Sequence, residues 1–338
     1  MEELIEKAKL SIGEDKPNDY KITPTTFPNE LDKSAPELSK ILKHSSFQEK
    51  AGRYEQHDAL AISSQSKFKS YAHQTTWAIG FAAIAGSLLA GLSVANFNFK
   101  PQYIQTCLFV LLGLVSTIGG GLAAFRLHQI KSQNLLERWM AARAKAETER
   151  LGYFSSLSRD LVKNNADDIF LQLQFVCMFK RYQLEVQRLY YNARSGDHRN
   201  SLETTSTIGA IAALCLALGS GILGMVGAFI SDLLPLAALG TIGAAISIVA
   251  SRREQLNQDE RNAERYTRTA DILSKIAEKH DDVLAAVAQG GMHNVLIKYV
   301  DAVNDQLSLE HRQWTSEVSE MSAALAALEE SISDLHKD

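Results

Sequence analysis

The sequence predicts an all-α integral membrane protein with two transmembrane helical hairpins, four spans in all, and long cytoplasmic helices that form a bundle. Three observations lead to this fold class: long uncharged stretches, small-residue spacing within them and helical periodicity between them. The four stretches lack Asp, Glu, Lys, Arg and His and cover residues 75–97, 103–125, 208–230 and 233–250. Stretches of 18 to 23 residues span roughly 27 to 35 Å as helices, which matches a hydrocarbon core of about 30 Å.

Charge and cysteine content narrow the class further. The formal net charge is −4 and the cations form no single basic block, so we expect no nucleic-acid partner. The three cysteines (Cys107, Cys177, Cys215) make no C-x-x-C pair, which disfavours disulfides and metal thiolates. The first ten residues are charged rather than apolar, so we expect no signal peptide and insertion through the chain's own helices.

Basic residues predict the orientation. Eleven Lys and Arg residues lie within about 15 residues of the four outer span ends, whereas the two short hairpin connections contain one, Lys100. The positive-inside rule therefore places the N-terminus, the middle segment and the C-terminus in the cytoplasm.

The segments between the hairpins read as helices, taken here in chain order. Residues 1–44 are expected to form a partly disordered arm, since four of the six prolines fall in residues 1–36. A helix is expected to lead into the first span, and residues 126–163 to form one helix with a break at Asn164-Asn165. The next helix, residues 167–193, carries an apolar stripe that must be buried.

The second half repeats this plan. A shift of 127 overlays Glu137-Arg138-Trp139 on Glu264-Arg265-Tyr266, which indicates a tandem repeat of hairpin followed by long helix. A helix over residues 251–289 is expected to end at Gly290-Gly291. From Trp314 to Leu335 apolar residues step by 4 and 3, a heptad seam that fits internal packing or a multimer contact equally well.

Small residues within the spans mark close helix contacts, because helices in lipid gain little from apolar burial alone. They form a candidate pore or helix-packing face: Gly113, Thr117, Gly121, Gly209, Ala213, Ala217, Gly221 and Gly224. Packing is the simpler interpretation, and the lining of a pore in an oligomer is the functional one. The absence of charges within the spans disfavours proton relays and ion-coupled transport, whereas a pore would have a small-residue lining gated by constriction and dewetting.

Enzyme motifs fail on inspection, so we expect no catalytic activity, no cofactor and no metal. The string Gly219–Gly224 satisfies G-x-G-x-x-G, but it lies within a span and follows no strand. No nucleophile, base and orienting group occur together.

A candidate cytoplasmic regulatory face follows the hairpins. Trp139, Arg143 and Glu147 recur every four residues, which suits an Arg–Glu pair beneath an interfacial Trp. A structural role is favoured over ligand binding, and arginines near the membrane exits are the nucleotide-binding alternative. The full candidate set is Arg138, Trp139, Arg143, Glu147, Arg252, Arg253, Arg261 and Arg265.

At dispersed helical positions the chain resembles the SLATT family, the two-transmembrane effector domains of bacterial conflict systems. It looks like two such domains in tandem. The first unit is expected over residues 45–165 and the second over residues 166–318, with residues 319–338 as the end of the heptad tail. Asp301 stands where the family pattern has Glu. The residues that carry the resemblance are Gln65, Phe68, Arg138, Trp139, Arg143, Ala146 and Glu147 in the first unit and Tyr182, Gln187, Tyr190, Tyr191, Glu264, Arg265, Tyr266, Val300, Leu307, Glu310 and Trp314 in the second.

The resemblance implies a homo-oligomeric, pore-forming effector of the bacterial inner membrane. It implies opening in anti-phage or stress defence when a nucleotide second messenger or a sensor protein acts on it. The structural alternative is a non-conducting membrane anchor whose cytoplasmic bundle docks a partner protein.

Overall fold

The computed structural model describes residues 1–94, 102–226, 238–290, 293–316, 322–323 and 325–326. Within these ranges the chain is helical and contains no strand, which confirms the all-α class. The elements before the first hairpin connection are α1 (Glu2–Ile12), the 3₁₀ turn η1 (Asp19–Lys21), α2 (Phe27–Leu31), α3 (Pro36–Leu42) and α4 (Ser45–Val94). The central elements are α5 (Gln102–Ser132), α6 (Leu135–Asn164), α7 (Ile169–Phe179), the π-helix η2 (Lys180–Glu185) and α8 (Val186–Val226). The last elements are α9 (Ala238–Asn257), α10 (Asp259–Glu278), α11 (His280–Ala288) and α12 (His293–Ser316).

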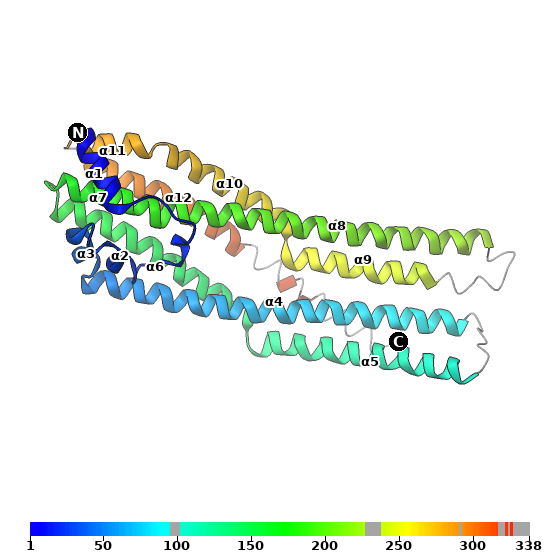
Figure 1. The fold of residues 1–338 in the computed structure, drawn as a ribbon. Helices are drawn as coiled ribbons and strands as arrows, with labels where there is room; N and C mark the ends of the chain where they lie inside the picture. Colours follow the sequence, from blue (N-terminus) through cyan, green and yellow to red (C-terminus); the bar gives the residue numbers. More distant parts are fainter. Residues whose placement is uncertain (95–101, 227–237, 291–292, 317–321, 324, 327–338) are drawn as a thin grey trace. The chain divides into compact units, whose positions relative to one another are not determined.

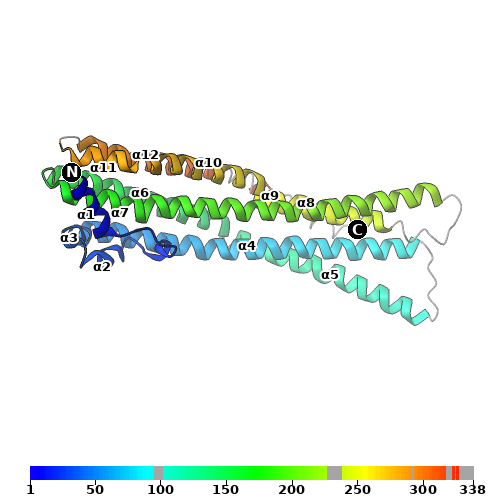
Figure 2. The same ribbon diagram turned by 45° about the horizontal axis from the view of Figure 1, so that its top comes forward.

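The helices divide into two compact units. Unit 1 contains residues 1–64, 137–197 and 261–316, and unit 2 contains the described residues of 65–136 and 198–260. The long helices α4 and α8 run without interruption through these boundaries (Figures 1 and 2).

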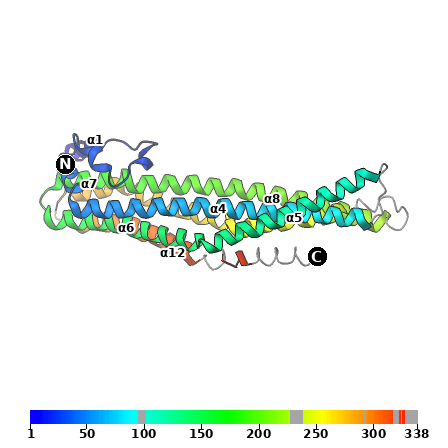
Figure 3. The same cartoon turned by 90° about the horizontal axis from the view of Figure 1, so that it is seen from below.

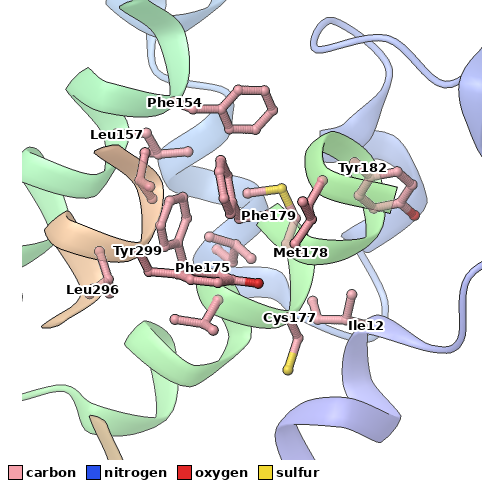
Figure 4. Packing of buried hydrophobic residues seen from close by; sticks show 14 of the residues in the cluster. Ile12, Phe154, Leu157, Phe175, Cys177, Met178, Phe179, Tyr182, Leu296 and Tyr299 are labelled. Carbon is pink, nitrogen blue, oxygen red and sulfur yellow. The ribbon is translucent and has the colours of Figure 1, made fainter. Parts of the chain in front are cut away.

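Unit 1 is organised around α7, in which every residue except Gln172 and Gln174 is apolar. The Asp168 side chain caps its N-terminus by accepting a hydrogen bond from the Leu171 backbone N–H at 2.9 Å. Since a helix that is apolar all round must be buried, α1, α3, α11 and α12 all pack against α7. Figure 4 shows the resulting core, in which Phe179 meets both Phe154 and Tyr299 edge to face.

The N-terminal residues differ from the expected disordered arm. They form three helices and a 3₁₀ turn, and α1 lies against α7 (Figure 3). Phe27 is 1% exposed and stacks on Tyr182 at 4.7 Å between ring centroids. Arg181 donates through Nε to Asp19 at 2.7 Å and through Nη1 to the Ile12 carbonyl at 2.5 Å. The proline-rich composition of these residues predicted disorder, but the apolar residues between the prolines pack against α7.

Unit 2 contains two antiparallel hairpins. In the first, formed by residues 65–94 of α4 and by α5, a Cβ at Gly119 would lie 2.9 Å from the Ala78 carbonyl oxygen. In the second, formed by α8 from residue 198 onward and by α9, a Cβ at Gly243 would lie 2.7 Å from the Ala212 carbonyl oxygen. Both glycines therefore permit backbone contact that any larger residue would prevent.

Two helical stretches in the described chain are long and apolar enough to cross a membrane, Tyr103–Ser132 and Ile169–Gly219. The first contains the second expected span, and the second reaches into the third. A four-span topology remains a prediction.

The outgoing helix of each hairpin ends at a non-glycine residue with positive φ. Asn134 has φ 47° between α5 and α6, and Gln258 has φ 49° between α9 and α10. The single helices expected over residues 126–163 and 251–289 are therefore wrong, because a left-handed residue breaks each one. α10 also ends before α11, at Lys279. The expected ends at Asn164 and near Gly290, which has φ 75°, are confirmed, while most of the heptad seam lies outside the described residues.

Candidate functional site

A buried charge cluster in unit 1 is the candidate functional site. Its members come from five helices, α4, α6, α8, α10 and α12, and alternate in charge. They are Asp58, Arg143, Glu147, Arg150, Tyr191, Arg265 and Glu310. Such groups are almost never buried unless paired, so their pairing defines the site.

Glu147 is the centre of the first half of the cluster. Its side chain is 7% exposed and lies between Arg143 Nη2 at 2.6 Å and Arg150 Nη2 at 2.5 Å. Arg143 also reaches Asp58 Oδ1 at 3.4 Å, which ties α6 to α4. The helical spacing explains the geometry, because residues three and four apart share a face and bring both guanidinium groups to one carboxylate.

Glu310 is the centre of the second half. The Tyr191 hydroxyl donates to Glu310 Oε2 at 2.9 Å, and Arg265 Nε lies 3.5 Å from Glu310 Oε1. Arg265 also donates to Asn262, one turn earlier on α10. The tyrosine and the carboxylate are 119 residues apart in sequence, so this half of the cluster joins α8, α10 and α12.

The two glutamates are shifted in opposite directions. Burial acts to raise the pKa of Glu147, but Arg143 and Arg150 outweigh it and bring the pKa below its ordinary value. Burial raises the pKa of Glu310 above its ordinary value, and Arg265 and the Tyr191 hydroxyl offset only part of that effect. Two carboxylates with diverging pKa values are a feature of functional sites as well as of structural networks.

The neighbouring titratable groups follow the same physics. Burial raises the pKa of Asp58, with Arg143 opposing it. Burial lowers the pKa of His311, which lies beside the cluster on α12. The cluster therefore holds several charged side chains in a partly desolvated environment. Protonation or deprotonation of one carboxylate would change which ion pairs it can form.

The structure brings together only part of the predicted regulatory face. Arg143, Glu147 and Arg265 lie in the cluster, and the predicted Arg143–Glu147 pair is present. Trp139 is buried, whereas Arg138 is exposed.

The remaining arginines of that face lie elsewhere. Arg261 is exposed, and Arg253 in unit 2 donates to Ser201 Oγ at 3.4 Å. The side chain of Arg252 lies outside the described residues. Among the described residues no group of three or more His, Cys, Asp or Glu side chains could hold a metal ion.

Sequence reasoning missed Arg150 and Asp58, and it named Tyr191 and Glu310 only through the family resemblance. The i, i+3 spacing of Glu147 and Arg150 was a usable local signal. Glu310 had no local signal, because its partners come from distant helices.

The candidate pore or helix-packing face lies open in unit 2. A Cβ at Gly113, Gly121, Gly209 or Gly221 would meet no atom within 4 Å, and Thr117, Ala213 and Ala217 are exposed. Gly224 lies in α8, but its surroundings are outside the described side chains. The close contacts within unit 2 use other glycines, Gly80, Gly119 and Gly243.

Large apolar side chains are exposed on the same hairpins. On α5 they include Val110, Leu111, Leu114 and Ile118, each more than half exposed. An apolar surface of this extent requires a membrane or another protein to cover it.

The chain was compared with protein-family models, curated proteins and solved structures. None matches it.

Proposed function

We propose that the chain is a homo-oligomeric membrane effector whose hairpins cross the bilayer and line a regulated pore. The observation that carries this proposal is the open small-residue face of unit 2. The glycines that hold each hairpin together differ from those that lie open, Gly113, Gly121, Gly209 and Gly221. Small residues left open on an apolar helix suit close approach by a helix of another copy, because they let backbones meet.

The four-span topology belongs to this proposal. Exposed apolar side chains on α5 and α8 favour lipid as the surrounding medium. A path lined by Gly, Ala and Thr without ionisable side chains would select ions weakly and close by dewetting.

Regulation through unit 1 also belongs to the proposal, in line with the resemblance to SLATT effectors. Arg143, Glu147 and Arg265 are engaged in internal pairs. A nucleotide or sensor protein would therefore meet exposed Arg138 first, or would have to open the charge cluster.

Substitution of the open face tests the proposal. Gly209→Val places a side chain where the chain offers open space, so each copy should fold normally while close approach between copies is lost. The matched control is Ile211→Val on the same helix, where the side chain is 52% exposed and helical spacing turns it away from the small-residue face.

Oligomer mass in detergent and ion flux in proteoliposomes are the measurements. We expect Gly209→Val to reduce both, and Ile211→Val to change neither. The anchor function would be established instead if the wild-type protein were monomeric, passed no ions and bound a partner protein through the helices of unit 1.

A further inference from the structure

We use the term open end for the end of the first hairpin that lies away from residues 95–101. Side-chain contacts hold α4 and α5 together up to this end. Ser116 Oγ donates to the Ala82 carbonyl oxygen at 3.2 Å in the middle of the pair. At the open end Arg126 of α5 meets Tyr71 of α4, with the guanidinium carbon 4.8 Å from the ring centroid. Arg126 directly follows the uncharged stretch of α5.

Arg126 is fixed in place but not neutralised. Its Nη1 donates to Gln129 Oε1 at 2.7 Å, and its Nε is buried without a hydrogen-bond partner. The Phe125 ring centroid lies 5.7 Å from the guanidinium carbon. Across the described part of the chain no carboxylate pairs with Arg126, although a half-buried guanidinium normally has an anionic partner.

The hairpin contains no anion of its own to supply that partner. No Asp or Glu occurs from residue 59 to residue 136, while four cations flank the two uncharged stretches on the open-end side, Lys67, Lys69, Arg126 and Lys131. The second hairpin is different, because Asp259 accepts from His198 Nδ1 at 2.6 Å and from Ser201 Oγ at 2.5 Å. Residues 59–136 therefore contain cations and no carboxylate in their own sequence, whereas the second hairpin includes Asp259.

We propose that the open end of the first hairpin binds the phosphate of an anionic phospholipid, with Arg126 as the main contact. The planar guanidinium presents paired N–H donors that match phosphate oxygens, and the Tyr71 ring holds its plane. Six and ten residues beyond Tyr71 on α4, the Trp77 and Phe81 rings are 38% and 56% exposed. Such amphipathic and apolar rings suit the glycerol and upper acyl region beside a headgroup.

This inference rests on the membrane placement proposed above. A free phosphate shares the chemistry of a headgroup phosphate, but only a lipid also covers the exposed rings. Charge attraction to an anionic leaflet contributes about 1 kcal/mol for each Arg or Lys near the surface, which is about fivefold in binding.

The test uses the full chain in nanodiscs of phosphatidylcholine alone or mixed with phosphatidylglycerol, with retained lipids counted by native mass spectrometry after release. The wild type should retain phosphatidylglycerol preferentially. Arg126→Gln should lower that preference about fivefold, and Arg126→Lys should lower it less. Arg159→Gln is the matched control, since Arg159 is 65% exposed toward the far end of α6 from the uncharged stretch and should leave the preference unchanged. Unchanged circular dichroism shows that each variant is folded.

Three results would overturn the inference. One is equal retention of the two lipids by the wild type, and another is an equal loss in Arg126→Gln and Arg159→Gln. The third is removal of the preference by millimolar inorganic phosphate, which would assign the site to a soluble ligand. Failure of the chain to enter bilayers at all would refute the proposed function as well, so the two failures are distinguishable.

Discussion

Replacement of Glu147 by Gln should destabilise unit 1 strongly, because this carboxylate pairs with the buried Arg150 and the half-buried Arg143. Removing one partner of a buried ion pair costs about 3–5 kcal/mol. Arg143 would keep Asp58 at 3.4 Å, whereas Arg150, whose side chain is 6% exposed, would lose the carboxylate with which it forms an ion pair. We therefore expect a loss near the lower limit, about 3 kcal/mol.

The assay is thermal unfolding of the detergent-purified full chain at pH 7. For a unit of 150–250 residues each 1 kcal/mol shifts Tm by about 2–4 °C. Glu147→Gln should thus lower Tm by about 6–12 °C. Glu310→Gln is the matched control, because a glutamine oxygen can still accept from Tyr191. The raised pKa of Glu310 indicates that relief from burying its charge outweighs the loss of the Arg265 contact at 3.5 Å. That variant should melt within about 2 °C of the wild type or above it.

Two outcomes would refute this reasoning. If Glu147→Gln melted with the wild type, the carboxylate would not stabilise the buried arginines. If Glu310→Gln lost as much as Glu147→Gln, the opposite pKa directions of the two glutamates would be wrong.

Three further predictions concern other features. The Tm advantage of Glu310→Gln over the wild type should grow as pH rises from about 4.5 through the raised pKa, because only the wild type must then ionise a buried carboxylate. Asp19→Asn should destabilise unit 1 by about 3 kcal/mol and speed proteolysis within residues 1–44, since Arg181 loses its carboxylate. Asn134→Val should lower stability by about 1–2 kcal/mol and Asn134→Gly should not, as measured by thermal unfolding, because exposed Asn134 has positive φ.

The helices could be predicted from the sequence because their signals are local. Uncharged stretches, helical periodicity and the glycine after α11 each depend on neighbouring residues. The Arg143–Glu147 pair was predictable for the same reason, since four residues bring both side chains to one helix face.

The rest depends on contacts between distant segments. Glu310 and Tyr191 meet only after α8 and α12 pack, and the N-terminal helices are ordered by an α7 surface more than 100 residues away. The breaks at Asn134 and Gln258 carried no glycine or proline to indicate them. Small-residue spacing identified contact faces in general, but it could not separate Gly119, which packs within the hairpin, from Gly113, which lies open.

Because Asn134 and Gln258 break the backbone after α5 and α9, the two helices of each hairpin differ in how they continue into unit 1. α4 and α8 enter their hairpins as continuous helices, whereas α5 and α9 leave through a jointed backbone at Asn134 and Gln258. A twist or axial push applied to residues 45–64 of α4 would pass along its continuous helical hydrogen bonds into residues 65–94. The same push cannot pass along the outgoing limb, which follows α4 through side contacts such as Ser116 with Ala82. In each hairpin a movement would therefore be transmitted by the continuous incoming helix, and the outgoing helix would follow through its side-chain contacts.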